Sequence, residues 1–127
     1  RIDGVPTDVT RTEPSVAWSA GALISSGTDL NHFYLSLLSG TVVPAAQLPE
    51  MLTTLPAFSD TGIGYGLGIA GTKLPCGTQY YGHNGEIPGY LTISGATRES
   101  RAVTLTLTTS HNTDPNLLDL LTDALCP

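Results

Sequence analysis

The chain has 127 residues and a mass of 13.2 kDa, which corresponds to one domain that is long enough to bury a substantial core. Apolar residues make up 40 % and charged residues 13 %, which excludes an intrinsically disordered chain, and no apolar run approaches the roughly 18 residues of a membrane helix. The net charge is −6 and Lys73 is the only lysine, which excludes the basic surface needed to bind nucleic acid or an anionic membrane.

The first segment, residues 1–27, is predicted to be an extended connection that borders a cleft. Residues 1–20 are rich in Pro, Thr and Asp and show no apolar periodicity, as is typical of a segment lying over a surface or beside a site. Trp18 is expected either to line that cleft or simply to pack as the sole tryptophan. The chain begins at Arg1 without a signal peptide, so we expect a processed product or a piece of a longer protein.

The next segment, residues 28–56, is predicted to be helical. Thr28 is placed to cap a helix with Asp29 in its first turn, and Gly40 is placed to end that helix. A second helical stretch contains Pro49, which is expected to kink or shorten it. The first helix has apolar residues at helical spacing, which predicts a buried stripe of Leu30, Phe33, Tyr34, Leu37 and Leu38.

Residues 62–127 are predicted to form a sheet followed by a C-terminal helix. From Gly62 the apolar period changes from 3.6 to 2, which is typical of β-strands. Four strands are expected, at about 62–70, 78–83, 90–96 and 103–108. The element order predicts an α+β fold in which helices flank an antiparallel sheet of about four strands.

The C-terminal helix is predicted to pack on the sheet. Asp114 is placed to cap this helix and Pro115 to open it. Its predicted apolar face consists of Leu117, Leu118, Leu121, Ala124 and Leu125.

Two cysteines, Cys76 and Cys126, are separated by 50 positions. They are either two unrelated buried thiols or a disulfide, and their positions at the boundaries of a strand and of the terminal helix favour the disulfide. Closing such a loop would stabilise the fold by about 4 kcal/mol. A disulfide also indicates an oxidising compartment, so we expect a secreted, extracellular protein.

Self-sufficient catalytic and metal-binding signatures are absent from the sequence. There is no G-x-S-x-G nucleophile motif and no H-E-x-x-H motif. Neither cysteine has a close partner of metal-ligand spacing, and the histidines are scattered along the chain as His32, His83 and His111. No metal and no cofactor is therefore expected.

One glycine-rich stretch, residues 80–90, is placed at the end of a predicted strand. His83 and Asn84 lie between glycines that let a ligand or another backbone approach the strand edge closely. Two interpretations stay open on these residues alone. The stretch is either a strand–turn–strand link in which His83 is a satisfied polar residue, or one side of a binding site.

A resemblance to a known family favours the second interpretation. The motif Gly82-His83-Asn84-Gly85 resembles the third motif (Lys or His, then Thr or Ser, then Gly) of the serine penicillin-recognising enzymes. These are D-alanyl-D-alanine carboxypeptidases, class C β-lactamases and related esterases. Residues 19–30 resemble the family's A-G-G-x-x-S-T-x-x-D-L segment, and residues 64–68 resemble its Y-G-L-G strand. The two cysteines, Cys76 and Cys126, match positions that are bridged in secreted carboxypeptidases of this family.

The resemblance covers nearly all of residues 1–127 but only the C-terminal portion of the family's catalytic unit, and it implies a partial β-lactamase/transpeptidase-like fold. His83 would then supply positive or hydrogen-bonding character beside the nucleophile, and its charge matters because imidazole titrates near neutral pH. Asn84 replaces the usual hydroxyl residue, Gly85 completes the motif, and the backbone N–H of Glu86 would be an oxyanion-hole donor. The expected substrate-binding residues are Trp18 and Tyr81.

Two further motifs of the family, S-x-x-K and Y-x-N, are missing from this chain. Lys73 has Ala70 three places earlier, and no tyrosine has an asparagine two places later. The chain alone is therefore predicted to be inactive, because the nucleophile and its proton shuttle would lie on an N-terminal portion of the same catalytic unit, which is the expected partner. Removing that portion should leave an open sheet edge and an exposed apolar face that permit self-association.

The resemblance implies a secreted serine acyl-hydrolase that acts on D-Ala-D-Ala peptides of the peptidoglycan type or on β-lactams. Some carboxypeptidases of the family bind the substrate carboxylate with an arginine on the strand before the third motif, but residues 66–71 contain no basic residue. This departure favours an esterase or amidase of the same family as one alternative. A non-catalytic module that binds a peptide or partner along the same strand edge is the other.

Overall fold

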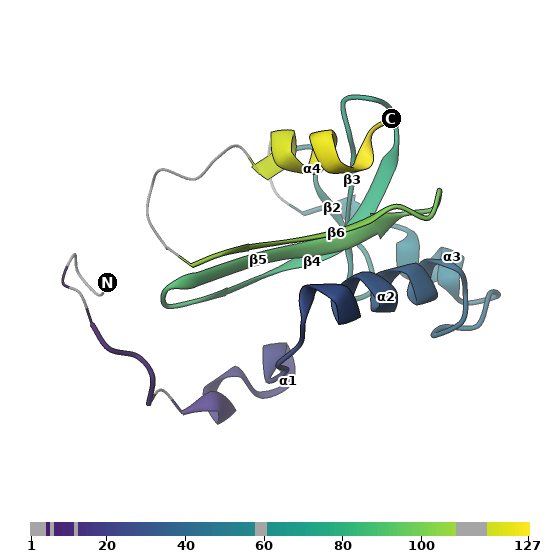
Figure 1. Cartoon of the computed structure of the whole chain (residues 1–127). Helices are drawn as coiled ribbons and strands as arrows, with labels where there is room; N and C mark the ends of the chain where they lie inside the picture. Colours follow the sequence, from purple (N-terminus) through teal and green to yellow (C-terminus); the bar gives the residue numbers. More distant parts are fainter. Residues whose placement is uncertain (1–4, 6, 12, 58–60, 109–116) are drawn as a thin grey trace.

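A six-stranded antiparallel sheet has helices on both of its faces (Figure 1). The computed structural model describes residues 5, 7–11, 13–57, 61–108 and 117–127. The strands lie side by side in chain order and each pairs with the next: β1 (Leu55–Pro56), β2 (Gly64–Tyr65), β3 (Ala70–Lys73), β4 (Gln79–Ile87), β5 (Tyr90–Thr97) and β6 (Ala102–Leu107). The helices are a 3-10 helix (Pro14–Ala17), α1 (Trp18–Gly21), α2 (Gly27–Leu38), α3 (Leu48–Leu52) and α4 (Leu117–Leu125).

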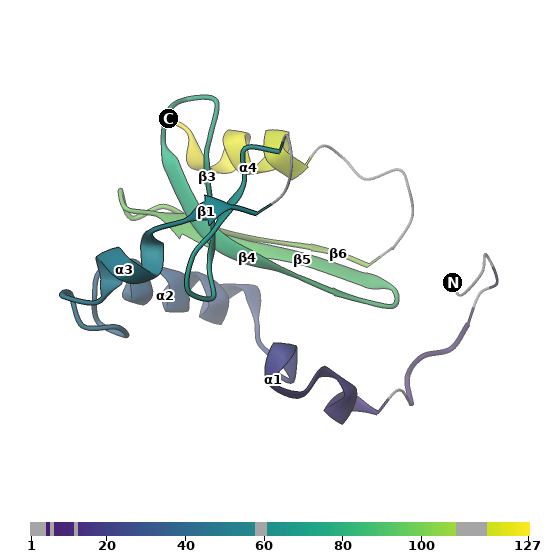
Figure 2. The same cartoon turned by 180° about the vertical axis from the view of Figure 1, so that it is seen from behind.

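The helices α2 and α4 lie on opposite faces of the sheet, which we name the α2 face and the α4 face (Figures 1 and 2). Side chains alternate between these faces along β4 and β5, because successive residues of a strand point to opposite sides. The core on the α2 face consists of Tyr34, Leu37, Leu38, Leu48, Leu52, Ile69 and Ala96. The core on the α4 face is smaller and consists of Leu74, Tyr80, Leu121 and Leu125.

The first long helix, α2, begins earlier than predicted. Its N-cap is Ser26, not Thr28: the Ser26 Oγ accepts a hydrogen bond from the Asp29 N–H (3.1 Å) and donates one to the Asp29 carboxylate (2.7 Å). This reciprocal arrangement satisfies one of the free N–H groups of the first turn. Gly40, at φ +82°, follows the end of the helix as predicted. Phe33 is 47 % exposed, so its predicted place in the buried stripe is wrong.

The second helix, α3, has only five residues, and residues 28–56 are not helical throughout. Pro49 lies in its first turn, where proline is tolerated because the N–H it lacks has no partner there in any case. Pro49 therefore shortens the helix, as predicted. The end of the segment, Leu55–Pro56, is strand β1.

The predicted strand at 62–70 is wrong, because this stretch folds into two strands with a turn between them. The Gly66 N–H donates to the Ile69 carbonyl (2.8 Å), and Gly68 has φ +76°, a conformation that favours glycine. A Cβ on Gly66 would clash with the Met51 carbonyl oxygen. The alternating glycines therefore form a turn at Gly68 and let the backbone at Gly66 lie close to Met51. The sheet has six strands, whereas about four were predicted.

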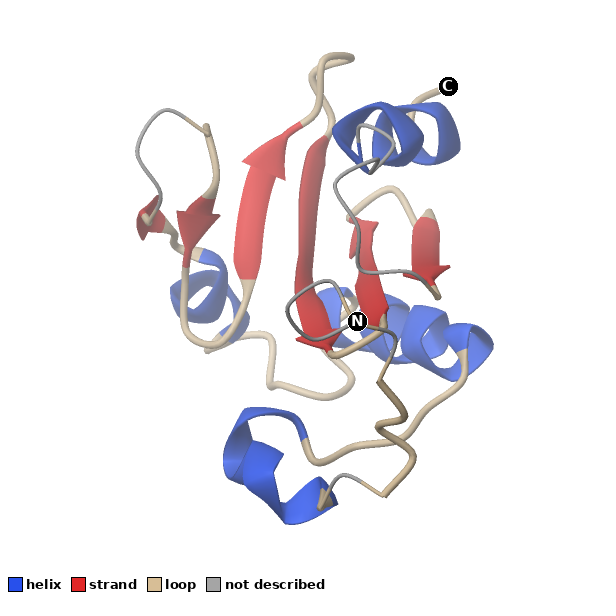
Figure 3. Ribbon diagram, turned by 90° about the vertical axis from the view of Figure 1, so that its left-hand side faces the viewer, coloured by secondary structure: helices blue, strands red, loops and turns tan. Residues whose placement is uncertain are grey.

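Strands β4 and β5 form a hairpin that is longer than predicted. They run over residues 79–87 and 90–97 and are joined at Pro88 and Gly89, where Gly89 has φ +90°. The motif around His83 therefore lies inside a strand, and its predicted position at a strand end is wrong. Figure 3 shows the strands of the sheet side by side with the helices around them.

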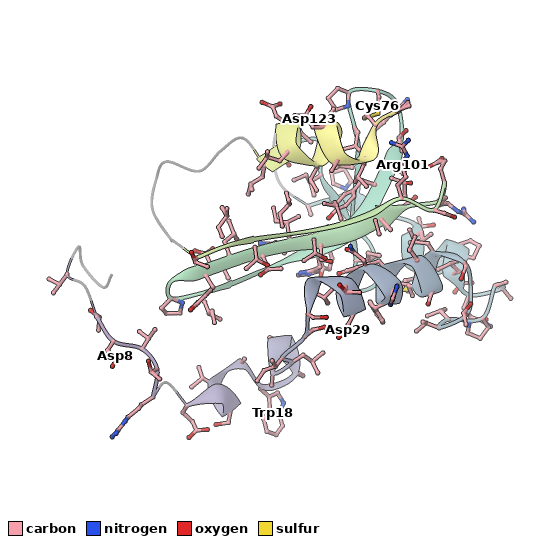
Figure 4. The ribbon with its side chains drawn as sticks, in the orientation of Figure 1. Asp8, Trp18, Asp29, Cys76, Arg101 and Asp123 are labelled. Carbon is pink, nitrogen blue, oxygen red and sulfur yellow. A yellow bond between two sulfur atoms is a disulfide. The ribbon has the colours of Figure 1, made fainter. Side chains whose placement is uncertain are left out.

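The C-terminal helix, α4, packs on the sheet as predicted, and its end is fixed in two ways. A disulfide joins Cys76, in the turn after β3, to Cys126, with 6.1 Å between their Cα atoms. The Arg101 guanidinium donates to the Cys126 carbonyl (2.7 Å) and to the Leu125 carbonyl (3.4 Å), which places a cation at the negative end of the helix dipole. Figure 4 labels Cys76 and Arg101 at the same end of α4.

The predicted apolar face of α4 is only partly buried. Leu121 and Leu125 are buried, whereas Leu118 is 41 % exposed and Ala124 is also exposed. The predicted capping residues Asp114 and Pro115 lie outside the described residues. Across the described ranges, no helix has both the length and the apolar character needed to cross a membrane.

Candidate active site

The motif around His83 lies on a part of β4 that has a strand neighbour on one side only. Strand β3 pairs with β4 from Lys73↔Gln79 to Ala70↔Gly82 and ends there. From His83 to Ile87, β4 pairs with β5 on one side, and no described strand lies against its other side. Backbone hydrogen-bonding groups on such an edge are available to an extended ligand.

His83 is hydrogen-bonded through both ring nitrogens. Its Nε2 lies 2.7 Å from the Tyr65 Oη, and the two rings meet edge to face with 5.6 Å between their centroids and an interplanar angle of 81°. Its Nδ1 lies 2.6 Å from the carbonyl oxygen of Asn84. These contacts hold the imidazole at the outer edge of β4 although the side chain is exposed.

Tyr65 lies 18 residues from His83 along the chain, and no local sequence pattern indicates their contact. The tyrosine belongs to the Y-G-L-G stretch, whose alternation predicts a strand. The available signal was the glycine pattern that follows it: the turn at Gly66–Gly68 ends β2 and lets Tyr65 lie beside the end of β3, within reach of β4. Because the alternation itself predicts one continuous strand, the sequence does not predict this contact.

The remaining motif residues, Asn84, Gly85 and Glu86, are all exposed on the same strand. Strand alternation places Gly85 on the α2 face with His83, and places Asn84 and Glu86 on the α4 face. The register agrees, since His83 pairs with Ser94, and Asn84 pairs with Ile93 of the α4-face cluster. The motif therefore presents groups to both sides of one open edge.

The structure brings one of the two predicted substrate-binding residues near this edge. Tyr81 shares the α2 face with His83, but it is half-buried and packs against the core of that face. Trp18 is 79 % exposed in α1, and Figure 4 shows its ring directed away from the sheet. The cavity that His83 borders is not lined by Trp18. A substrate contact by either residue stays a prediction.

A cavity of about 610 Å³ lies on the α4 face and reaches the motif at one end. Tyr65, His83 and Asn84 border that end. Apolar side chains of β5 and α4 line much of the remainder, namely Leu91, Ile93, Leu117, Leu118 and Leu121, and residues between 61 and 82, which include Thr61, Thr72 and Tyr80, line the rest. No Ser, Cys or Lys of the described chain lines this cavity. The site can therefore orient and polarise a bound group, but its lining lacks the serine nucleophile of the enzymes that the motif resembles.

One polar atom within this cavity's lining is buried without a partner. The Tyr80 hydroxyl has no hydrogen-bond partner in the described part of the chain, and Tyr80 as a whole is 5 % exposed. Burial, with a smaller contribution from Tyr34, raises the pKa of Tyr80 far above its ordinary value. Its ring lies over Gly82 and Gly95, where any Cβ would clash with it. Tyr80 is therefore a neutral packing residue rather than a candidate base.

The other charged or metal-ligating residues do not add to the site. Lys73 is exposed and pairs with Gln79 at the far end of β3 from His83. Among the residues that the structure describes, no group of three His, Cys, Asp or Glu side chains is placed to hold a metal ion. The disulfide between Cys76 and Cys126 confirms the predicted pairing.

The family model for Beta-lactamase matches residues 2–125, which is almost the whole chain. The chain belongs to the beta-lactamase family. This match agrees with the resemblance of the His83 motif to the penicillin-recognising enzymes, and with the antiparallel sheet that carries a C-terminal helix on one face.

Solved structures of larger enzymes contain the same fold. A D-stereospecific amidohydrolase from Streptomyces sp. is 32 % identical, with a TM-score of 0.76 over 89 % of this chain and 33 % of its own. A D-amino acid amidase from Ochrobactrum anthropi SV3 is 28 % identical, with a TM-score of 0.65 over 80 % of this chain and 32 % of its own. The same amidase complexed with D-phenylalanine is 24 % identical, with a TM-score of 0.67 over 85 % and 36 %. The chain thus spans about a third of the length of these structures.

Proposed function

We propose that this chain forms one wall of the active site of a secreted serine acyl-hydrolase that cleaves amide bonds next to D-amino acid residues, including D-Ala-D-Ala peptides. The observation that carries this proposal is the open edge of β4 on which His83 is held by Tyr65. In this proposal, an N-terminal portion of the same catalytic unit supplies the nucleophile, the S-x-x-K lysine and the Y-x-N tyrosine. The chain alone is then inactive.

The charges of the described residues favour an amide over a free C-terminal carboxylate as the preferred substrate group. A carboxylate bound in a site generally has a cation beside it, but Lys73 lies at the far end of β3 and Arg101 is engaged at the end of α4. Neither residue lines the cavity that His83 borders. The similarity to a D-stereospecific amidohydrolase, at 32 % identity, supports the same choice.

Two other features support a larger, secreted protein. The disulfide between Cys76 and Cys126 supports an oxidising compartment. The segment before α2 exposes apolar side chains that a covering portion would bury: Val16, Trp18, Leu23 and Ile24. Relatives of which this chain covers only 32–33 % have room for such a portion.

The proposal is tested by acylation of the complete catalytic unit, obtained by extending the reading frame upstream of Arg1. We expect the extended protein to form a covalent adduct with a fluorescent penicillin and to hydrolyse D-phenylalanine amide faster than the L-enantiomer. The 127-residue chain should form no adduct. An extended protein that contains S-x-x-K but is neither labelled nor active on the amide would contradict the proposal and would favour a module that binds peptides without catalysis.

The role of His83 in that reaction is tested by substitution within the extended protein. We expect His83→Ala to lower the acylation rate about 100-fold, which is within the range for loss of a group assisting proton transfer or charge stabilisation. His83→Lys should retain much of the rate, because the third motif of the resembling family starts with either residue. The matched control is His32→Ala, since His32 is exposed on α2 and its loss should leave acylation unchanged.

A further inference from the structure

The hydrogen bonds of His83 determine which of its nitrogens carries the proton. A carbonyl oxygen only accepts hydrogen bonds, so the 2.6 Å contact between Nδ1 and the Asn84 carbonyl requires a hydrogen on Nδ1. In the neutral imidazole the other nitrogen, Nε2, then holds only a lone pair. The Tyr65 hydroxyl, 2.7 Å away, must therefore donate its hydrogen to Nε2.

This network leaves the neutral imidazole of His83 without an N–H to offer a substrate. The atom of the pair that still has hydrogen-bonding capacity is the Tyr65 Oη, which keeps a lone pair after donating its own hydrogen. Tyr65 is 38 % exposed and lines the same cavity as His83 and Asn84. A group that enters this end of the cavity therefore meets the phenol oxygen as a hydrogen-bond acceptor.

We infer that Tyr65 is a positioning residue that holds neutral His83 in the Nδ1–H tautomer and presents its own oxygen to an N–H group of the substrate. The second part rests on the proposed function, because it assigns the substrate a hydrogen-bond donor such as an amide N–H₂ or an amine. The first part depends only on the contacts of this chain. Tyr65 is thus assigned the positioning of His83 and one substrate contact, but no step in bond cleavage.

The tautomer is tested on the 127-residue chain itself by long-range ¹H–¹⁵N correlation of the histidine side chains at mildly alkaline pH. We expect His83 to show a protonated Nδ1 and an unprotonated Nε2. His83→Gln identifies the signals by removing them, and exposed His32 serves as an internal reference for an imidazole on the surface of a helix. An Nε2–H tautomer for His83 in the native chain would overturn the inference without any variant.

The role of the tyrosine is tested by Tyr65→Phe, which keeps the ring but removes the hydroxyl. We expect the His83 signals to lose the exclusive Nδ1–H pattern and to show a mixture in which Nε2 is protonated. Tyr90→Phe is the matched control, because Tyr90 is a similarly exposed tyrosine at the tip of the hairpin, and it should leave the pattern unchanged. An unchanged pattern in Tyr65→Phe overturns the positioning role.

The contact with substrate is tested in the extended protein by the kinetics of D-amino acid amide hydrolysis. Loss of one hydrogen bond to a substrate N–H should lower kcat/KM roughly ten-fold in Tyr65→Phe, whereas Tyr90→Phe should leave kcat/KM unchanged. An unchanged kcat/KM in Tyr65→Phe overturns the substrate contact. The positioning role and the proposed function can fail separately. If His83 has the Nδ1–H tautomer but the extended protein forms no acyl-enzyme, the positioning role is supported and the proposed function is rejected.

Discussion

The helices α2 and α4 cover opposite faces of one sheet but bury it unequally. On the α2 face, α2, α3 and the turn after β2 contribute to one continuous cluster that includes Leu37 and Ile69, at 2 % and 1 % exposure. On the α4 face, the buried cluster is smaller and lies near the disulfide, while the opposite end of α4 borders a cavity of about 610 Å³. The α2 face is therefore packed chiefly by side chains, and the α4 face depends on a covalent link.

The two faces therefore differ in how completely the described residues pack them. Protein interiors are normally packed without large voids, so the largely apolar cavity under α4 marks this face as less completely packed than the α2 face. A second open edge lies on the opposite side of the sheet, because β6 pairs only with β5 among the described strands. The predicted open edge is thus present, whereas self-association through it stays a prediction.

The largest expected effect comes from removing the disulfide. We expect the double variant Cys76→Ser and Cys126→Ser to lose about 4 kcal/mol of unfolding free energy, because the bridge restricts a 50-residue loop in the unfolded chain. Amide exchange should accelerate more in α4 than in α2, since α4 is the element that the bridge holds. Urea unfolding with mass-resolved amide exchange measures both, and equal acceleration in the two helices would remove the proposed difference between the faces.

A smaller effect is expected from the same truncation made on each face. Leu37→Ala on the α2 face should cost about 3 kcal/mol, and Leu121→Ala on the α4 face should cost about 2 kcal/mol. Both side chains are at least 95 % buried, but Leu121 already borders the cavity and loses fewer contacts. Urea unfolding of the two variants tests the ranking, and a larger loss at Leu121 would show that the α4 face is packed as tightly as the other.

The smallest expected effect is a stabilisation at Tyr80. Tyr80→Phe should raise the unfolding free energy by about 1 kcal/mol at neutral pH, because it removes a buried hydroxyl that has no hydrogen-bond partner in the described part of the chain. Burial raises the pKa of Tyr80, so the folded protein keeps this proton at a pH where the unfolded chain releases it. The unfolding free energy of the native chain is therefore unaffected by this group below the ordinary tyrosine pKa of about 10, and it falls as the pH rises above that value.

The pH dependence gives this prediction a control of its own. Urea unfolding is measured near neutral pH and again about one unit above the ordinary tyrosine pKa of about 10. Between these two pH values, Tyr80→Phe should lose less unfolding free energy than the native chain. Tyr90→Phe, which changes an exposed tyrosine of β5, should behave like the native chain at both pH values. An alkaline loss that is identical in all three proteins would contradict burial of the Tyr80 hydroxyl.

The sequence predicted the elements whose signals are local. The stripe from Leu30 to Leu38 gave α2, the alternation in β5 and β6 gave two adjacent strands, and the cysteine positions favoured the bridge that the structure contains. The helix and the strands depend on residues that are close in the chain, and the bridge depends on a single pair of cysteines. The α+β class followed from their order, and the family match agrees with it.

The features that the sequence did not predict depend on contacts between distant residues. Glycines alternating with apolar residues fit a strand, but at 66–68 they form a turn because Gly66 lies against the Met51 carbonyl. A single strand over 62–70 does not predict the Tyr65–His83 contact. That contact requires β2 and β4 to lie on either side of β3. His83 and the motif around it were identified through the resemblance, because their neighbours along the chain do not reveal the tyrosine.

The disulfide also has a topological consequence for the candidate site. It closes residues 76–126 into a covalent ring that contains β4, β5, β6 and α4. His83 belongs to this ring, whereas Tyr65 belongs to the linear part of the chain that precedes it. The hydrogen bond between them therefore joins the ring to the linear part of the chain. One backbone cut inside the ring would leave every piece covalently attached through the disulfide. A cut between β2 and Cys76 would instead break the covalent connection between Tyr65 and His83.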